Sequence, residues 1–405
     1  MCAKLYMMRL DLPGLWSDGW LYKEHLILWS RDGHMYILPV DHITRQLRGL
    51  ERPPHEVLAD FLIFRNDWKA SEQFERLFSL QGIEESFTAN FPKATGEIVI
   101  PIDEATPIPI GSDRIPGEIL DSAIYDNRVY VGSTHGLFET RFDPDSPIAR
   151  NPLIDRMPQR VSAVTAGFSA INGSAGESGL WFSRMNRDDE TWWDARSNFK
   201  RVADYSRGNS FADVNLLNYT DEAFPGFLRS ETVKERPQDA SVRESRQITG
   251  YRQQADIGTL MTSALTSSRT TGHGDPDFSL GIDDEGPEVL GNSGKRLLVA
   301  WKDSLRVIDL SLHRDRDLAA KADKSYQGIA ALEIDPYAIL DTHAFGKSFL
   351  VELSREVQLI HPHGSFTLIS EPVARIRTFA RSRRYREVVL LVRETGVSLL
   401  GMYVA

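Results

Sequence analysis

The strongest chemical signal in the sequence is a run of arginines near its C-terminal end. The stretch Arg375–Arg386 reads RIRTFARSRRYR, in a chain whose formal net charge is −10. Guanidinium groups bind carboxylates and phosphates through paired hydrogen bonds. The run therefore predicts a surface for an acidic partner or for nucleic acid, and the alternative is a solvated strand pair whose charges protect a sheet edge. The candidate binding residues are Arg377, Arg381, Arg383, Arg384 and Arg386.

A second candidate for partner binding is a pair of adjacent tryptophans. Trp192 and Trp193 lie in the charged stretch Arg187–Arg196, RDDETWWDAR. Tryptophan and arginine dominate the energetics of protein interfaces. The alternative is that one of the two rings packs back onto the fold, because adjacent residues of a strand point to opposite faces.

Carboxylates beside predicted turns are candidates for hydrolytic chemistry. Asp18, Asp32, Asp126 and Asp303 all lie beside predicted turns. Glycoside cleavage needs two carboxylates at a defined separation, which sequence spacing cannot show, and aspartate beside a turn more often bonds the local backbone. A G-x-S-x-G nucleophile motif is absent, and Ser169 and Ser174 have no histidine partner that the sequence identifies. We therefore predict no catalytic residues.

Two short motifs resemble ligand sites without meeting their requirements. His361-Pro362-His363 places two imidazoles together, but no third ligand is nearby and the chain has one cysteine, Cys2. Gly346-Lys347-Ser348 is similar to a phosphate loop, yet Asp341 stands where that motif needs glycine. Both are interpreted as turns, and the sequence predicts neither a metal nor a cofactor.

Composition limits the partners of the chain. An acidic protein of 405 residues repels phosphate, so general binding to nucleic acid or to an anionic membrane is disfavoured. We identify no signal peptide and no apolar run near the about 18 residues that a membrane helix needs. A single cysteine excludes an internal disulfide and fits a reducing compartment. We expect a cytoplasmic protein with no membrane contact.

The elements that must position these residues are short strands, and the clearest are in Glu118–Ser146. Asp126-Asn127 is a turn pair, Arg128–Gly132 alternates with Val129 and Val131 on one face and Tyr130 on the other, and Gly136 closes a second turn before Leu137–Phe142. Strand, turn, strand, turn, strand is an antiparallel meander, which cannot bury both faces alone. It needs neighbouring copies.

Looser copies occur along the whole chain. Their turns centre on Gly33, Gly136, Gly179, Gly226, Ser304, Arg355 and Gly396. Where no insertion intervenes the spacing is about 40 to 50 residues, the period of propeller blades. Seven turns predict an all-β fold, a β-propeller of seven blades, or of six if the Gly226 unit is not one. Strands at both chain ends predict ring closure in one blade.

The repeats resemble those of known β-propeller proteins. Arg128–Phe138 (RVYVGSTHGLF) and Ser178–Ser183 (SGLWFS) are similar to repeats of two-component-sensor propellers and, loosely, of WD40 proteins. The Gly-His and Trp-Asp marks of WD40 repeats are missing. The resemblance implies a propeller and no particular activity.

Two stretches depart from the repeat within a single propeller domain of residues 1–405. Residues 41–117 are predicted to be an insertion or degenerate blade with a short helix over Trp68–Leu80. Residues 230–295 are polar and poor in large apolar side chains, which predicts a mobile surface insertion with one helix near Ala255–Leu265.

These observations favour a non-catalytic interaction scaffold or regulatory subunit that binds another protein. The 230–295 insertion would control it by docking or by proteolytic cleavage. The alternative function is a carbohydrate-active propeller hydrolase or lyase with carboxylates at the central funnel.

Overall fold

A computed structural model describes most of the chain. It covers residues 5–48, 58–65, 97–99, 106–108, 114–146, 151–185, 199–233, 247–255, 257–261, 287–301, 304–312, 318–322 and 334–404, with isolated positions at 76–89 and at 326. By its internal contacts the chain forms two compact units. Unit 1 is Met1–Pro109, Pro144–Ile148 and Ala338–Ala405, and unit 2 is Ile110–Asp143 and Ala149–Tyr337.

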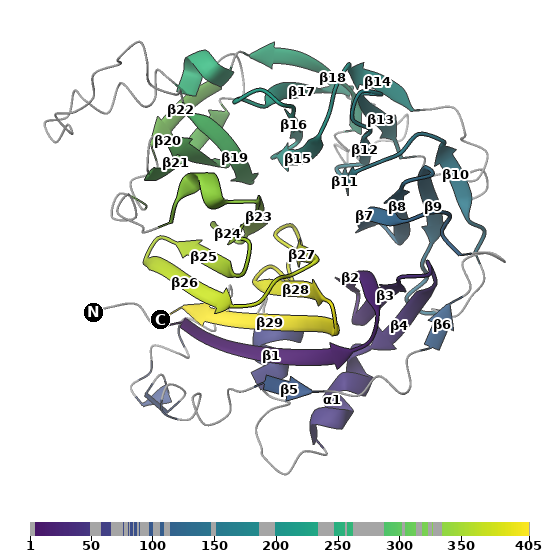
Figure 1. Cartoon of the computed structure of the whole chain (residues 1–405), viewed down its shortest axis with the longest axis vertical. Helices are drawn as coiled ribbons and strands as arrows, with labels where there is room; N and C mark the ends of the chain where they lie inside the picture. The colour runs from purple at the N-terminus through teal and green to yellow at the C-terminus, as the bar shows by residue number, and fades with distance from the viewer. Residues whose placement is uncertain are drawn as a thin grey trace, which may run out of the picture. The chain divides into compact units, whose positions relative to one another are not determined.

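Unit 1 contains three sheets built from both ends of the chain (Figure 1). The first has the order β2 (Trp16–Tyr22), β3 (His25–Ser30), β4 (Met35–Pro39), β6 (Thr106–Ile108). The second is β23 (Asp341–Phe345), β24 (Ser348–Glu352), β25 (Val357–His361), β26 (Gly364–Ile369). The third is β27 (Arg375–Thr378), β28 (Val388–Arg393), β29 (Gly396–Val404), β1 (Leu5–Pro13), β5 (Glu97–Val99).

Unit 2 contains four sheets of four strands each. They are β7 (Ile119–Tyr125), β8 (Arg128–Ser133), β9 (Leu137–Arg141), β10 (Ile154–Met157), and β11 (Ala163–Gly167), β12 (Ala170–Ser174), β13 (Leu180–Arg184), β14 (Lys200–Ala203). The others are β15 (Gly208–Ala212), β16 (Asn215–Tyr219), β17 (Gly226–Val233), β18 (Gln247–Ala255), and β19 (Glu288–Ser293), β20 (Arg296–Trp301), β21 (Ser304–Leu312), β22 (Leu318–Ala322).

Seven antiparallel meanders in chain order are the blades of a seven-bladed β-propeller, as predicted. Each predicted turn position lies between the second and third strands of a different blade, or begins the third strand as Gly226 does in β17. The Gly226 unit is therefore a blade, and six blades are excluded. In the blade of the template stretch, Asp126 and Asn127 have φ of 52° and 58° and join β7 to β8. Aspartate and asparagine tolerate this left-handed backbone, so the turn chemistry alone located the hairpin.

Both ends of the chain meet in one blade. β1 pairs antiparallel with β29 over nine residues, from Leu5↔Val404 to Pro13↔Gly396, and the two strands lie side by side in Figure 1. Met8, Leu10 and Leu12 of β1 are fully buried in this blade. The predicted closure is confirmed, and it removes the open sheet edges that the terminal strands would otherwise expose.

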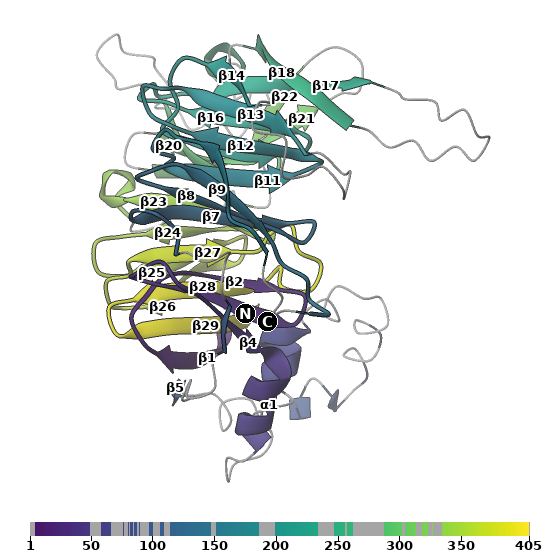
Figure 2. The same ribbon diagram turned by 90° about the vertical axis from the view of Figure 1, so that its right-hand side faces the viewer.

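Residues 41–117 follow β4 and return to its blade. The helix α1 (Val40–Arg48) buries Val40, Ile43, Thr44 and Leu47, and Figure 2 shows it at the end of unit 1 near β4. A π-helical segment, Asp60–Phe64, packs against β29, and β6 then supplies the fourth strand beside β4. The helix predicted over Trp68–Leu80 lies almost wholly outside the described residues.

The stretch 230–295 contains more strand than predicted. Ser230–Val233 of β17 pairs with Gln247–Tyr251 of β18, and β19 and most of its turn to β20 lie within the same stretch. The prediction of a largely unstructured insertion is wrong for these residues. Ile248 and Tyr251 are buried while polar neighbours face solvent. An outer strand that buries only one face has a polar composition, and this is why the composition did not predict it. Residues 257–261 are helical, within the predicted helix, and residues 234–246 and 262–286 lie outside the described part. A 3-10 turn, Pro336–Ala338, precedes β23.

Candidate protein-binding surface

The predicted arginine run forms strand β27 and the loop that follows it. We call Phe379–Glu387 the arginine loop; it connects β27 to β28. Its two aromatic residues anchor it, because Phe379 and Tyr385 are both buried. Their rings lie edge to face at 6.2 Å, and Phe379 meets Trp20 of β2 in the same way at 5.5 Å. The loop is thus held by an aromatic row that continues into the next blade.

Hydrogen bonds fix the backbone of the loop. Ser382 N donates to Phe379 O at 2.7 Å, and Tyr385 N donates to Ser382 Oγ at 3.1 Å. The Tyr385 hydroxyl accepts from the backbone N of Glu24 at 2.9 Å, and burial raises the pKa of this phenol. The loop therefore presents its charges from a fixed frame, which lowers the ordering cost of binding.

Two neighbouring turns border the arginine loop. Arg384 Nη1 lies 2.6 Å from Glu24 Oε1 in the turn between β2 and β3. The turn between β23 and β24 also comes close, because a Cβ on Gly346 would lie 4.0 Å from Arg386 Nε. These turns carry exposed Lys23 and Lys347.

The arginine surface, as we define it, combines the loop with these turns. Its cationic side chains are Lys23, Lys347, Arg381, Arg383, Arg384 and Arg386. Arg381 and Arg383 are exposed, and Arg384 and Arg386 are partly buried. Glu24 and Glu387 are the acidic residues of the three turns. Excess positive charge in a chain of net charge −10 favours an acidic ligand at this place.

Arg377, also predicted to bind a partner, is turned toward the core. Its guanidinium holds both carboxylate oxygens of Asp18, at 2.7 Å from Nε to Oδ1 and with a second bond from Nη2 to Oδ2. Arg375 adds a bond of 3.2 Å, and Gly19 N donates to Oδ1 at 2.8 Å. Asp18 is 0% exposed, and Arg377 also lies 6.0 Å from the Trp20 ring.

The Asp18–Arg377 pair ties the first strands of two blades, β2 and β27. The same kind of link recurs in unit 2, where Asp121 of β7 accepts from Val164 N of β11. Thr165 of β11 bonds Asn209 of β15, and Ser210 of β15 bonds Asn292 of β19. Polar residues on first strands thus join neighbouring blades, and Asp18 is one of them.

The other candidate carboxylates lie in turns. Asp32 is exposed between β3 and β4, where the hydroxyl of Ser30 and the nearby His34 lower its pKa. Asp126 is one of the two left-handed residues between β7 and β8. Asp303 lies outside the described residues. Asp32 and Asp126 thus occupy the structural positions that turn-forming aspartates favour.

The remaining motifs also fall in turns and strands. His361 and His363 flank the turn from β25 to β26 with ring centroids 5.0 Å apart, and burial, followed by the charge of His363, lowers the pKa of His361 to about 4. Ser174 Oγ accepts from Ser206 Oγ and Asn209 Nδ2, both at 2.7 Å, and Ser169 is a left-handed turn residue. Within the described part of the chain no three His, Cys, Asp or Glu side chains gather as metal ligands would.

Two further predictions concern the tryptophan pair and membrane contact. Trp192 and Trp193 lie outside the described residues, and their role stays a prediction. No helix among the described residues is long and apolar enough to cross a membrane.

Sequence reasoning missed the residues that hold the arginine loop. Trp20 of β2 and Glu24 of the turn after it contact the loop, Lys23 and Lys347 border it, and all four are more than 30 positions away from it in the sequence. The signal that could have suggested them is the first-to-second-strand turn of each blade, because these turns emerge at the same edge of adjacent blades.

The sheet topology and the arginine surface define this chain as an all-β propeller with a basic patch on an acidic body. No protein-family model and no curated protein matches the sequence. Two solved structures are similar over nearly the whole chain. The β-propeller domain of Cps50 (Swd1) from Myceliophteria thermophila is 9% identical with a TM-score of 0.48, and 96% of each chain is covered. The computationally designed protein Ika8 is 8% identical with a TM-score of 0.46, over 97% of this chain and 98% of that one. The assignment of seven blades rests on the strand pairing of the chain itself.

Proposed function

We propose that this chain is a non-catalytic interaction module that binds an acidic segment of another protein through the arginine surface. The observation that supports this most is the arginine loop itself, which is anchored by buried Phe379 and Tyr385 while Arg381 and Arg383 remain exposed. A surface that is already ordered before binding loses less conformational entropy on association. Exposed guanidinium groups suit carboxylates, which they bind in a paired geometry.

The alternative of a carbohydrate-active hydrolase or lyase is less well supported. It needs two carboxylates that reach substrate. Asp18 is buried beneath two arginines. Asp32 lies in a turn between the second and third strands of its blade, and Asp126 in a turn between the first and second strands of its own. A screen of polysaccharides for released reducing ends tests this alternative directly, and release that a carboxylate substitution abolishes would replace our proposal.

Charge reversal tests the proposed surface. The variant Arg381→Glu with Arg383→Glu changes two exposed residues of the loop. The matched control, Arg31→Glu with Arg355→Glu, makes the same change of charge on turns between second and third strands of unit 1 blades, at the other strand ends. The probe is a fluorescent peptide of ten glutamates, and its binding is followed by anisotropy at several salt concentrations.

We expect the loop variant to lose at least about tenfold in affinity while the control keeps it, because two attractive charges become repulsive. Binding should also weaken with salt, since exposed charges are screened. Equal affinity of loop variant and control would contradict the proposal. A single-stranded oligonucleotide that binds more tightly than the peptide at the same salt would show that phosphate, and not a protein carboxylate, is the ligand.

We also propose that the stretch 230–295 controls the module by docking or by cleavage. Support comes from the pairing of Ser230–Val233 with Gln247–Tyr251, which holds both ends of residues 234–246 in one blade. A cut between the strands should therefore leave the two fragments associated. Limited proteolysis followed by gel filtration tests this, and separation of the fragments without denaturant would contradict it.

A further inference from the structure

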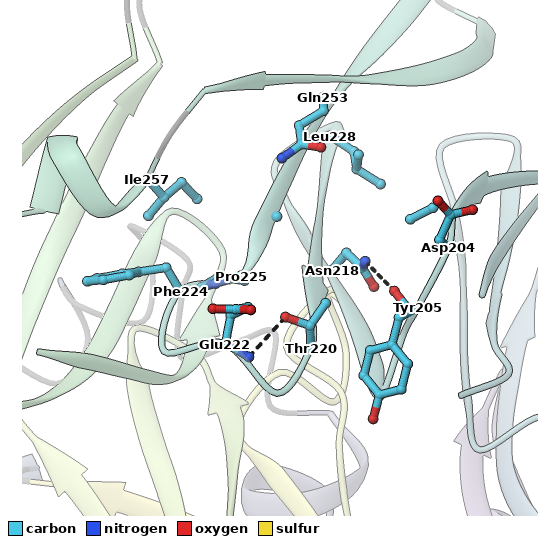
Figure 3. Close-up of a pocket in the computed structure, with 12 residues that line it drawn as sticks. Asp204, Tyr205, Asn218, Thr220, Glu222, Phe224, Pro225, Leu228, Gln253 and Ile257 are labelled. Carbon is cyan, nitrogen blue, oxygen red and sulfur yellow. Dashed lines mark hydrogen bonds between the residues drawn. The ribbon is translucent and has the colours of Figure 1, made fainter. Parts of the chain in front are cut away.

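A pocket in unit 2 is lined by residues that the proposed function does not use. Its volume is about 600 Å³, and it opens where β14 ends, beside the turn from β16 to β17. Figure 3 shows Phe224 and Ile257 on one side of this opening and Asp204 and Tyr205 on the other, with Asn218, Thr220 and Glu222 between them. This volume is within the range of small-ligand sites, about 300 to 1,000 Å³.

Asn218 supplies an acceptor that lacks a partner. Its side chain is only 4% exposed, and its Nδ2 donates to the backbone O of Tyr205 at 2.9 Å. Because a carbonyl can only accept, this bond fixes which end of the amide is the oxygen. Oδ1 has no hydrogen-bond partner among the described residues. A buried acceptor in this state costs free energy until a donor fills the site.

The charge of the pocket is negative. Asp204 and Glu222 line it, and the described lining residues include no lysine, arginine or histidine. Arg201 approaches Asp204 from outside the lining, with 3.5 Å between Nη2 and Oδ1. The hydroxyl of Tyr205 donates to Asp221 Oδ1 at 3.0 Å, which raises the pKa of that phenol, so this donor is already engaged. The side chains that line the pocket therefore carry negative charge, and the described lining has no cationic group to balance it.

Apolar side chains complete the lining. Leu228 and Ile257 are buried at 3% and 2% exposure, and Phe224 is partly buried against the apolar cluster that contains Ile257. The backbone N of Glu222 donates to Thr220 Oγ1 at 3.2 Å and orders the turn that carries both residues. The site therefore combines an acidic, acceptor-rich mouth with an apolar wall. A cation on an aliphatic stem matches both parts, since the stem can pack while the head is paired.

We propose that this pocket binds the side chain of an arginine or lysine from a basic peptide segment. The guanidinium or ammonium group donates to Asn218 Oδ1 and pairs with Glu222, and the methylene groups pack against Phe224 and Ile257. This site is independent of the arginine surface, which selects the opposite charge, so either proposal can fail without the other.

Calorimetric titration with three probes tests this inference on the full chain. The probes are the peptide Ala-Arg-Ala, the same peptide with neutral citrulline in place of arginine, and the free guanidine agmatine. We expect the arginine peptide to bind at least about tenfold more tightly than the citrulline peptide, because only the former carries a charge to pair. Tighter binding of agmatine than of the peptide would assign the site to a small cation instead. Equal binding of the arginine and citrulline peptides, or no binding at millimolar concentration, would overturn the inference.

Two single substitutions locate the binding. Glu222→Gln removes the charge of an exposed pocket residue and should weaken the arginine peptide about fivefold to tenfold. Asp213→Asn is the matched control, because Asp213 lies in the turn from β15 to β16 at the other end of the same blade. Both side chains are at the surface, so both variants should fold, which their thermal midpoints verify. Equal losses in the two variants would show that the effect is general charge and not the pocket.

Discussion

Replacing Asp18 by asparagine should destabilise the protein strongly. Asp18 is 0% exposed and accepts hydrogen bonds from Arg375, Arg377 and the backbone N of Gly19. Asparagine keeps the size of the side chain but removes its charge and turns an NH₂ group toward guanidinium donors. Two arginines then lose the buried carboxylate with which they pair.

The size of the expected loss of stability follows from the burial of the ion pair. Removing one partner of a buried ion pair costs about 3–5 kcal/mol. Arg375 and Arg377 retain 20% and 13% side-chain exposure, so water reaches their outer edges. We therefore expect the lower end of this range, about 3 kcal/mol in the free energy of unfolding.

Urea unfolding followed by tryptophan fluorescence measures this loss. Urea is preferable to guanidinium because a salt would screen the ion pair. Asp32→Asn in the same blade is the control, since Asp32 is exposed and should change stability by at most about 0.5 kcal/mol. A loss below about 1 kcal/mol for Asp18→Asn would refute the view that this pair links the two blades, since exposed pairs are worth that little.

A substitution of Arg377 tests whether this arginine stabilises the fold or binds the partner. Arg377→Met should also lower the free energy of unfolding, because it leaves the buried Asp18 carboxylate with fewer donors. If Arg377 is a structural residue, the Arg377→Met variant should bind the glutamate peptide with the same affinity as the unmodified protein. Loss of peptide binding in folded Arg377→Met would return Arg377 to the binding surface.

Two further predictions concern blade closure and pH. Gly396→Ala should lower the free energy of unfolding by about 1–3 kcal/mol, because the added Cβ would lie 2.4 Å from Leu12 O on the closing strand. Gly208→Ala is the control and should cause no such loss, because its added Cβ would have nothing within 4 Å. Equal thermal midpoints for the two variants would contradict the closure geometry. The pKa of His361 is lowered to about 4, so the unfolded chain binds a proton that the folded chain refuses between about pH 6.5 and 4. The contribution of neutral His361 to the free energy of unfolding should be fully present above this window and should fall as the pH decreases through it. The His361→Gln variant should show a shallower fall. Urea midpoints that depend on pH equally in the variant and in the unmodified protein would contradict this prediction.

Much of the fold could be predicted from the sequence because it depends on neighbouring residues. Asp126-Asn127 accepts left-handed backbone wherever it occurs, and Arg128–Gly132 alternates its side chains whatever lies beside it. A regular spacing of such units then predicts blades, since each meander must bury its faces against another. The prediction failed around Ile248, where an outer strand buries only one face and its polar composition resembled disorder.

The candidate sites were only partly visible in the same way. The arginine run was evident, but composition could not distinguish Arg377, which pairs with Asp18, from exposed Arg383. Asp18 and Arg377 are 359 positions apart, and their contact exists only because the chain brings its two ends into neighbouring blades. The pocket around Asn218 likewise gathers residues from β14, β16, β17 and the helical turn after β18. Local backbone preferences depend on consecutive residues, and the sequence therefore predicts them. The burial and pairing of a charge depend on which residues the fold places against it.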